Sequence, residues 1–211
     1  MIRKDIDNFL ASLPNDITLV AATKYGDKND ILDLFNHGVK NFGENRVDAF
    51  LTKYEELKDN QEIKWHFIGH LQRNKAKLII NKIDYLHSLD SLELAKMIDQ
   101  LRVKPLDTFI EVSINLEENK NGVPYYEVEQ FINNLKQFHN VHIVGLMMMA
   151  IKGSNDTTTQ FKKLRLLRDE LETKCNIKLP YLSMGMTDDY KEAILEGATH
   201  IRLGRILFDL N

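Results

Sequence analysis

Short apolar segments alternate with longer amphipathic segments along the whole of this sequence. The first apolar segment, residues 17–23, has no charged side chain and no polar alternation, which is typical of a strand buried on both faces. The next segment, residues 27–37, places Ile31, Leu34 and Phe35 on one helical face and ends before Gly38, a common helix stop. Repetition of these two signals predicts a parallel sheet whose strands are joined by crossover helices.

About eight strand–helix units can be counted in this way. The expected strands cover residues 17–23, 39–43, 65–69, 85–88, 108–114, 143–149, 181–184 and 199–203. The expected helices cover residues 27–37, 47–57, 74–80, 91–101, 126–138, 161–171 and 188–196. An open doubly wound sheet is the competing architecture, but no glycine-rich G-x-G-x-x-G turn follows the first strand. We therefore predict an α/β protein with one domain over residues 1–211, a single (β/α)8 TIM-type barrel.

The composition excludes several partners and compartments. The sequence has 28 basic and 31 acidic side chains, a net charge of −3, so no global field attracts nucleic acid or an anionic membrane. The single cysteine, Cys175, permits no internal disulfide, and we expect it to be an inert thiol near a helix end. Charges interrupt the N-terminal segment where a secretory signal needs an apolar run, and no uncharged run is long enough to span a membrane. We expect a cytoplasmic protein that binds neither nucleic acid nor membrane.

Polar side chains occupy the expected carboxyl ends of the strands, where a barrel of this kind carries its chemistry. They comprise Lys24, Glu44 to Arg46, His66 to His70, His87 to Asp90, Asn115, Ser183 to Asp189 and Arg202 to Arg205. The spacing of the histidines matches no metal signature, so we expect no metal site. We interpret His66, His70 and His87 as satisfied core residues.

Lys24 follows seven uncharged residues at the end of the first expected strand. A lysine at a strand end is often only a solvated charge. If apolar walls surround its stem, however, burial penalises the ammonium form and lowers the pKa from its reference value of about 10.4. Since the neutral amine adds to carbonyl groups, Lys24 is the candidate for covalent chemistry with an aldehyde.

Two glycine-containing segments predict a site for an anion. Residues 183–189, Ser-Met-Gly-Met-Thr-Asp-Asp, are typical of a loop that opens a helix, where unpaired N–H groups face outward. Taken alone, this motif would be interpreted as a helix cap. Gly204 adds a second element at the end of the last strand, and the ends of strands seven and eight are the usual phosphate site of these barrels.

Arg202 lies inside the last expected strand, two residues before Gly204. Its guanidinium would point either into the barrel mouth or into the helix layer, where an ion pair with a carboxylate is the simplest interpretation. A guanidinium stays protonated and can only donate hydrogen bonds. Beside a heterocyclic nitrogen, it would keep that nitrogen unprotonated.

Together these residues resemble the pyridoxal phosphate homeostasis proteins, small barrels related to the cofactor domain of alanine racemase. The resemblance covers nearly the whole chain. It is carried by the segments 20–24 (VAATK), 42–45 (FGEN), 65–69 (WHFIG), 71–72 (LQ), 74–75 (NK), 145–147 (GLM), 183–186 (SMGM), 188–189 (DD) and 202–204 (RLG).

The resemblance implies a cofactor and a set of residues that hold it. The cofactor is pyridoxal 5′-phosphate, bound to Lys24 as a Schiff base, with Asn45 beside the pyridine ring and Arg202 facing the ring nitrogen. The remaining cofactor contacts, mostly to the phosphate, are Ser183, Met186, Thr187, Gly204 and Arg205. No residue receives a catalytic role.

The sequence departs from the family pattern at three places. Arg205 stands where the family usually has serine or threonine after the final glycine, so a hydroxyl contact to phosphate is lost and a cation can replace it. Asp209 stands where the last motif often ends in glycine. The N-terminal helical region is shorter than usual, so the packing of the closing helix is the least defined part of the prediction.

Three functions are compared on this basis. The first is a non-catalytic holder of pyridoxal phosphate that takes part in cofactor homeostasis and thereby in amino-acid and keto-acid balance. The second is a racemase, which needs the ring as an electron sink and an acid–base group on each face of the substrate. Related racemases complete that pair with a further C-terminal domain and a partner subunit, and we expect no such domain because the sequence ends at Asn211.

The third function, a cofactor-free Schiff-base aldolase using Lys24, would not need the paired phosphate-binding strand ends. We therefore expect the non-catalytic holder. Its expected form is a monomer, and its candidate protein partners are apo-enzymes that depend on pyridoxal phosphate.

Overall fold

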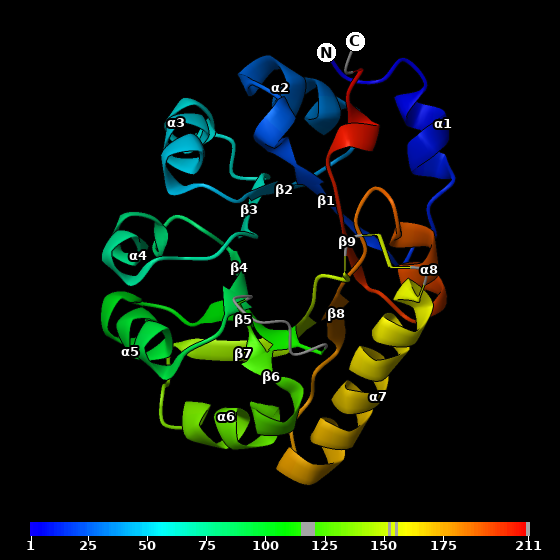
Figure 1. Ribbon diagram of the computed structural model, residues 1–211. Coiled ribbons are helices and arrows are strands. Elements are labelled where there is room, and N and C mark those ends of the chain that lie inside the picture. Colours follow the sequence, from blue (N-terminus) through cyan, green and yellow to red (C-terminus); the bar gives the residue numbers. More distant parts are fainter. Residues whose placement is uncertain (115–120, 152, 155, 210–211) are drawn as a thin grey trace.

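Eight parallel strands close into a barrel with helices around it, as the alternating pattern predicts (Figure 1). The computed structural model describes residues 1–114, 121–151, 153–154 and 156–209. The barrel strands are β1 (Thr18–Ala22), β2 (Asn41–Glu44), β3 (Lys64–Phe67), β4 (Tyr85–Leu89), β5 (Leu106–Ser113), β7 (Val141–Met147), β8 (Tyr181–Ser183) and β9 (His200–Leu203). Pairing of β4 with β5 closes the ring, and the short strand β6 (Val123–Pro124) adds to the end of β5.

Helices follow the strands and cover the outside of the barrel. They are α2 (Lys28–Asn36), α3 (Val47–Leu57), α4 (Arg73–Ile79), α5 (Leu92–Leu101), α6 (Val128–Leu135), α7 (Thr157–Cys175) and α8 (Tyr190–Leu195). Local signals start two of them: Asp27 and Asp30 form a capping box at α2, and the Ser91 hydroxyl caps α5. Three short 3-10 turns are also described: Thr23–Tyr25 follows β1, Arg205–Leu207 follows β9, and Tyr125–Glu127 precedes α6.

An additional short helix, α1 (Ile6–Ala11), fills the gap in the helical ring beside the last strand. Its Phe9 packs edge-on against Tyr190 of α8, with ring centroids 6.2 Å apart. On the other side, Asp7 pairs with His37 at the end of α2 at 2.6 Å. The alternation of apolar and amphipathic segments did not predict α1. This helix lies between α8 and α2 and closes the ring of helices (Figure 1).

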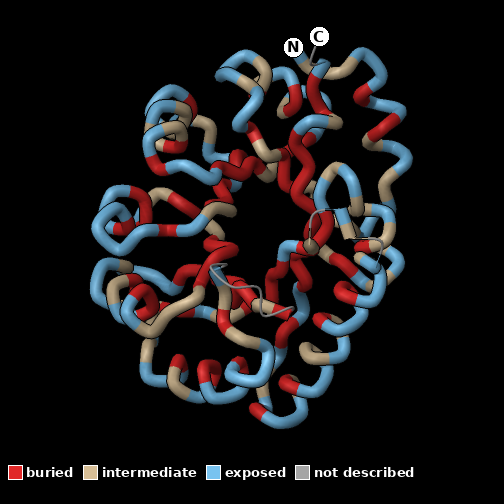
Figure 2. Tube along the Cα trace, in the orientation of Figure 1, coloured by how far each residue is buried: buried red, intermediate tan, exposed pale blue. Residues whose placement is uncertain are grey.

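The core has two separate parts. Apolar side chains fill the space between the strands and the inward faces of the helices, which are buried along their length (Figure 2). Inside the barrel a second, smaller cluster joins Phe109, Val144 and Met147 with Tyr85. Polar side chains, described below, fill much of the remaining interior.

Several predicted boundaries need correction. The helix expected over 161–171 covers Thr157–Cys175, because the segment stays helical until Asn176 adopts a left-handed conformation with φ 49°. The helix expected over 126–138 is reduced to Val128–Leu135, preceded by a 3-10 turn. Cys175 lies at the end of α7, as predicted, and the structure shows that it is buried. Asn115 lies outside the described residues.

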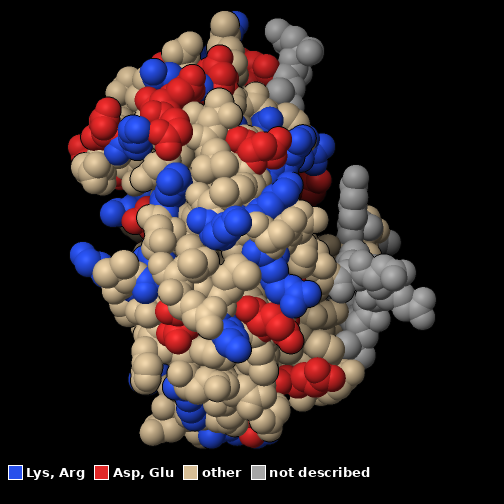
Figure 3. All heavy atoms as spheres, turned by 90° about the vertical axis from the view of Figure 1, so that its left-hand side faces the viewer, with Lys and Arg blue, Asp and Glu red and all other residues tan. Residues whose placement is uncertain are grey.

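The surface carries charges of both signs. Over the helices on the left of Figure 1, basic and acidic side chains are interspersed with uncharged ones (Figure 3). No helix in the described ranges is both long enough and apolar enough to cross a membrane.

Candidate functional site

Lys24 lies in the 3-10 turn that directly follows β1, at the carboxyl end of the barrel. The side chain is exposed, and its Nζ lies 4.6 Å from the centre of the neighbouring Tyr25 ring. The expectation of an amine enclosed by apolar walls is therefore wrong. The chain leaves the barrel at this point, so the turn lifts Lys24 away from the walls formed by the strand residues. The amine is instead accessible to a ligand that approaches from solvent.

A buried polar group supports the turn from below. The Glu44 side chain at the end of β2 is fully buried, and the Thr23 hydroxyl donates to its Oε1 at 2.6 Å. Lys53 of α3 donates to the same oxygen and to the Thr23 carbonyl oxygen, the latter at 2.6 Å. Lys53 thus connects α3 to the residue next to Lys24. Lys53 was not predicted as part of the site, although a lysine three residues after Phe50 and four before Leu57 on an apolar face was a usable signal.

The predicted anion loop follows β8. Gly185 has φ +93°, a conformation that favours glycine, and a side chain there would meet Ala193 Cβ of α8 at 2.6 Å. The Met186 N–H donates to Asp189 Oδ1 at 2.6 Å, so it is not the free donor that was expected. Thr187 has no hydrogen-bond partner within the described ranges and is half-buried.

The second predicted segment, at the end of β9, lies directly beside the Lys24 turn. The position of a Cβ on Gly204 is 3.5 Å from the Ala22 carbonyl oxygen and 3.6 Å from the Tyr25 ring. Arg205 donates to Asp188 at 2.6 Å, and both side chains are exposed. This ion pair joins the β8 loop to the turn after β9.

Arg202 points into the barrel and is buried. It donates from Nη1 to the Ser183 hydroxyl at 2.6 Å and from Nη2 to the Met148 carbonyl oxygen at 2.9 Å. Burial lowers the pKa of Arg202 to about 10, against the raising effect of the Glu111 and Asp189 carboxyl groups. Two of the five N–H donors of the guanidinium are thus paired with described residues, which leaves it able to donate to a ligand in the mouth.

Glu111 of β5 is a further buried charge-bearing group, located across the barrel from β1. Burial raises its pKa to about 7, the Asp90 carboxylate adds to this effect, and Arg202 opposes it. A carboxyl group with that pKa is partly protonated at neutral pH. Sequence reasoning missed it, since a glutamate within a strand gives no sign of which face it occupies until the barrel closes.

Two of the three histidines singled out from the sequence are interior residues, as expected. His66 and His87 are fully buried and hydrogen-bonded to each other at 2.8 Å. A third interior histidine, His200, was not singled out; its pKa is lowered to about 4 by burial and by Arg202. No group of three metal-binding side chains occurs among the residues that the structure describes. His70 is instead exposed at the rim and pairs with Asp90 at 3.2 Å.

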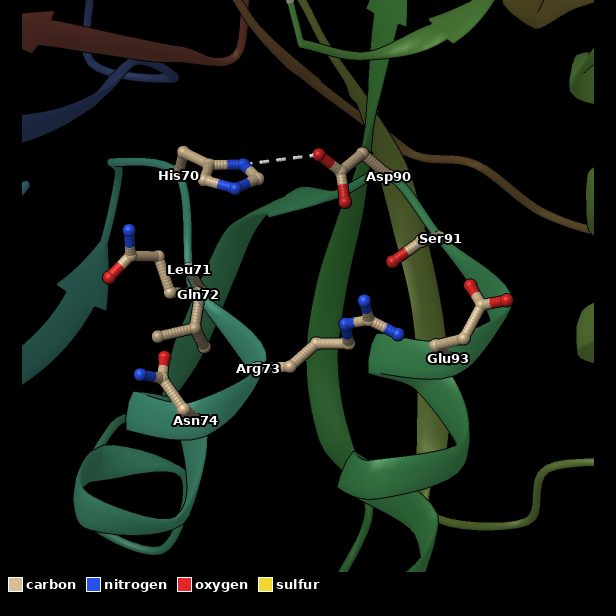
Figure 4. Close-up of a pocket in the computed structure, with 8 residues that line it drawn as sticks. All are labelled: His70, Leu71, Gln72, Arg73, Asn74, Asp90, Ser91 and Glu93. Atoms are coloured by element: carbon tan, nitrogen blue, oxygen red, sulfur yellow. Dashed lines mark ion pairs between the residues drawn. The ribbon is translucent and has the colours of Figure 1, made fainter.

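The rim between β3 and β4 contains a cavity of about 730 Å³ (Figure 4). Arg73 and Glu93 face the same space as the His70–Asp90 pair, so its lining carries both signs of charge. The cavity also includes Leu71, Gln72 and Asn74, which carried part of the sequence resemblance. None of the predicted cofactor residues lines it.

The predicted residues therefore meet along one arc of the barrel mouth. The strands β2, β1, β9 and β8 are consecutive neighbours in the sheet. Their carboxyl ends carry, in that order, Asn45 with an exposed side chain, Lys24, the pair Gly204 and Arg205, and the loop with Thr187. Arg202 lies beneath the same arc. A small molecule with an aldehyde, an anionic group and a hydrogen-bond acceptor fits this arrangement of donors.

Comparison with known proteins gives the same assignment at the level of family and fold. Residues 9–211 match the family described as alanine racemase, N-terminal domain. The chain is 42% identical over 199 residues to the pyridoxal phosphate homeostasis protein of Aquifex aeolicus, covering 92% of this chain and 87% of that protein. It is 37% identical to the protein of the same name from Synechocystis sp., covering 94% of each.

Solved structures show the same architecture. PipY of Synechococcus elongatus, in a structure with PLP bound, superposes with a TM-score of 0.90 at 31% identity, covering 98% of this chain and 99% of that chain. An alanine racemase of Clostridium difficile superposes with a TM-score of 0.80 at 14% identity, covering 96% of this chain and 55% of that chain. The second likeness shows the fold alone.

Proposed function

The chain belongs to the family of pyridoxal phosphate homeostasis proteins, built on the alanine racemase N-terminal domain, and from that premise we propose that it holds pyridoxal 5′-phosphate without catalysing a reaction. The observation that carries the proposal is the arc of neighbouring strand ends. It combines an accessible amine at Lys24, two loops joined by Arg205 and Asp188, and the buried donor Arg202.

Each part of the cofactor has a counterpart in these residues. Pyridoxal 5′-phosphate supplies an aldehyde that reacts with amines, a phosphate group and a pyridine nitrogen. In the proposal, Lys24 attaches the cofactor covalently, and Asn45 borders the ring. Thr187, whose hydroxyl has no partner in the described ranges, donates to the phosphate together with the backbone at Gly204 and the Arg205 side chain.

The chemistry of Arg202 supports a holder in preference to a racemase. A guanidinium donates to the ring nitrogen and does not protonate it, because its pKa of about 10 keeps the proton on the arginine. The electron-withdrawing capacity on which carbanion chemistry depends is thereby reduced. We propose that the protein serves homeostasis by retaining the cofactor and supplying it to apo-enzymes, through which it affects amino-acid and keto-acid balance.

Trapping the attachment tests this proposal. Purified protein mixed with pyridoxal 5′-phosphate and reduced with borohydride should gain the mass of one pyridoxyl phosphate, on the peptide that contains Lys24. Lys24→Ala should lose the adduct and keep its fold, because an exposed side chain contributes little to stability. Lys28→Ala, which removes another exposed lysine four residues away, is the matched control and should keep the adduct.

Two results would contradict the proposal. An adduct on a different lysine, or none, would remove Lys24 from its role. Measurable loss of optical rotation of alanine or serine, incubated for a day with excess protein, would replace the holder by a racemase.

A further inference from the structure

A series of hydrogen bonds crosses the barrel interior from Arg202 to Asn41. Arg202 donates to the Ser183 hydroxyl at 2.6 Å, and that oxygen lies 2.8 Å from Nδ1 of His87. Nε2 of His87 lies 2.8 Å from Nδ1 of His66, and Nε2 of His66 lies 3.0 Å from Oδ1 of Asn41. The five residues come from β9, β8, β4, β3 and β2, so the series spans the barrel.

The two imidazoles in this series are enclosed and held by aromatic rings. His66 stacks on Tyr85 and His87 on Phe109, with ring centroids 4.4 and 4.3 Å apart. Burial lowers the pKa of both histidines well below the usual value, and nearby His200 on β9 acts in the same direction. Arg202 on β9 further lowers the pKa of His87. Both rings are therefore neutral at physiological pH.

The groups at the two ends fix the direction of every hydrogen bond between them. Arg202 can only donate, and the Asn41 carbonyl oxygen can only accept. His66 must then carry its hydrogen on Nε2, and the free Nδ1 of this neutral ring accepts from Nε2 of His87. His87 in turn has a free Nδ1, which accepts the Ser183 hydroxyl hydrogen. In this arrangement both histidines are Nε2–H tautomers, and each hydrogen has one acceptor.

We infer that Ser183 and His87 are positioning residues that hold the Arg202 guanidinium in one orientation at the barrel mouth, with His66 and Asn41 fixing their hydrogen-bond polarity. The functional part of this inference rests on the proposed binding of the cofactor ring nitrogen by Arg202. It changes the role expected for Ser183: its oxygen accepts from Arg202 and its hydrogen is given to His87, so it acts through Arg202 and does not contact the ligand.

The direction of this series of hydrogen bonds can be tested without any cofactor. In protein labelled with 15N-histidine, long-range nitrogen–proton correlation spectra distinguish the two neutral tautomers from the imidazolium. Both His66 and His87 should be Nε2–H tautomers at about pH 7 and remain so at about pH 6. An Nδ1–H tautomer or an imidazolium at either residue would overturn the inferred direction of the hydrogen bonds from Arg202 to Asn41, whatever the protein binds.

Two substitutions at His87 test the consequence for the ligand. His87→Phe keeps a ring against Phe109 but can neither accept from Ser183 nor donate to His66. His87→Gln offers an amide oxygen that accepts and an amide nitrogen that donates. We expect His87→Phe to release pyridoxal 5′-phosphate about tenfold faster than wild type and to shift its absorption maximum, with His87→Gln within about threefold of wild type.

Both variants should still give the borohydride adduct on Lys24, which separates this inference from the proposed function. If wild type gives no adduct, the proposed function fails while the tautomer result stands. If the adduct forms and His87→Phe and His87→Gln behave alike, in release rate and in spectrum, the positioning role is wrong.

Discussion

Residues that a ligand does not contact define the position of Lys24. The buried Glu44 carboxylate is held by Lys53 and by the Thr23 hydroxyl, and its Oε2 has no hydrogen-bond partner among the described residues. Glu44 therefore depends strongly on Lys53, the group that compensates its charge. The turn carrying Lys24 depends on it too, through the bond from Lys53 to the Thr23 carbonyl oxygen.

Replacing Lys53 by methionine should lower the free energy of unfolding by about 3 kcal/mol, because it leaves the Glu44 carboxylate buried without a counter-charge. Denaturant titration measures the change. Lys58→Met, at the C-terminal end of the same helix, is the matched control, since Lys58 pairs with Glu55 at the surface, and it should leave the unfolding curve nearly unchanged. Equal effects of the two substitutions would show that Glu44 does not need Lys53.

Glu111 gives a pH dependence of known sign. Its pKa is about 7 in the folded protein and 4.5 in the reference state, so the folded state binds the extra proton between these values. The wild-type protein therefore loses stability from this group as pH rises from about 4.5 to about 7. Glu111→Gln has no carboxyl group to titrate, so it does not lose this stability. Its free energy of unfolding relative to wild type should therefore increase by up to about 3 kcal/mol as pH rises through this window.

The other titrating groups are common to both proteins and cancel in the difference. Unfolding curves of wild type and Glu111→Gln at several pH values measure it, and Glu93→Gln, which alters an exposed carboxylate, is the control. A constant difference across the window would contradict the burial of Glu111.

At the scale of elements, the loop after β8 depends on its contact with α8. Gly185 and Gly38 both have φ +93°, but only Gly185 is closely packed. A Cβ added at Gly185 would lie 2.6 Å from Ala193 Cβ, whereas a Cβ added at Gly38 would have no neighbouring atom within 4 Å. The two glycines therefore separate backbone strain from close packing.

Gly38→Ala should cost about 1 kcal/mol from the strained backbone alone, and Gly185→Ala should cost about 1–3 kcal/mol more because the loop must move off α8. Only Gly185→Ala should also weaken retention of pyridoxal 5′-phosphate. Thermal unfolding and dialysis measure the two effects. Equal stability losses, or unchanged retention in Gly185→Ala, would show that the loop geometry is unimportant for the site.

The bounds of an element were predictable where its apolar spacing begins and ends sharply, and short or unusually terminated helices were not predicted correctly. The helix over 47–57 was predicted with the bounds that α3 has, since its apolar spacing begins and ends sharply. Helix α1 has only six residues, too few to show a period. Helix α7 ends at Asn176, which adopts the left-handed conformation more often taken by glycine, so no glycine in the sequence signalled its length.

The site was predicted as a set of strand ends, but its interior was not. Position along the chain was enough to bring Lys24, Thr187 and Gly204 to one end of the barrel, because parallel strands share their carboxyl ends. The exposure of Lys24 and the bond from Met186 N–H to Asp189 depend on turn geometry. The hydrogen bond between Ser183, which accepts from Arg202, and His87 depends on barrel closure, since β4 and β8 are not neighbours in the sheet.

At the scale of the whole molecule, closure of the barrel brings together the segments of the proposed binding site, which lie far apart in the sequence. The first and last strands pair in register, with Ala21 opposite Leu203, so the turn with Lys24 and the turn with Gly204 are adjacent. The N-terminal segment also bridges to the C-terminal segment, where Ile2 pairs with Phe208. In the proposed function, the Lys24 amine and the loops after β8 and β9 hold two ends of a single molecule.

Binding of pyridoxal 5′-phosphate and of pyridoxal, which lacks the phosphate, to wild type and to Thr187→Ala measures whether one molecule spans Lys24 and these loops. The substitution should weaken binding of the phosphorylated form by about tenfold or more, the value of a hydrogen bond to a charged group, and leave binding of pyridoxal unchanged. An equal loss for both compounds, or equal binding of the two by wild type, would contradict the claim that one molecule spans Lys24 and the phosphate loops.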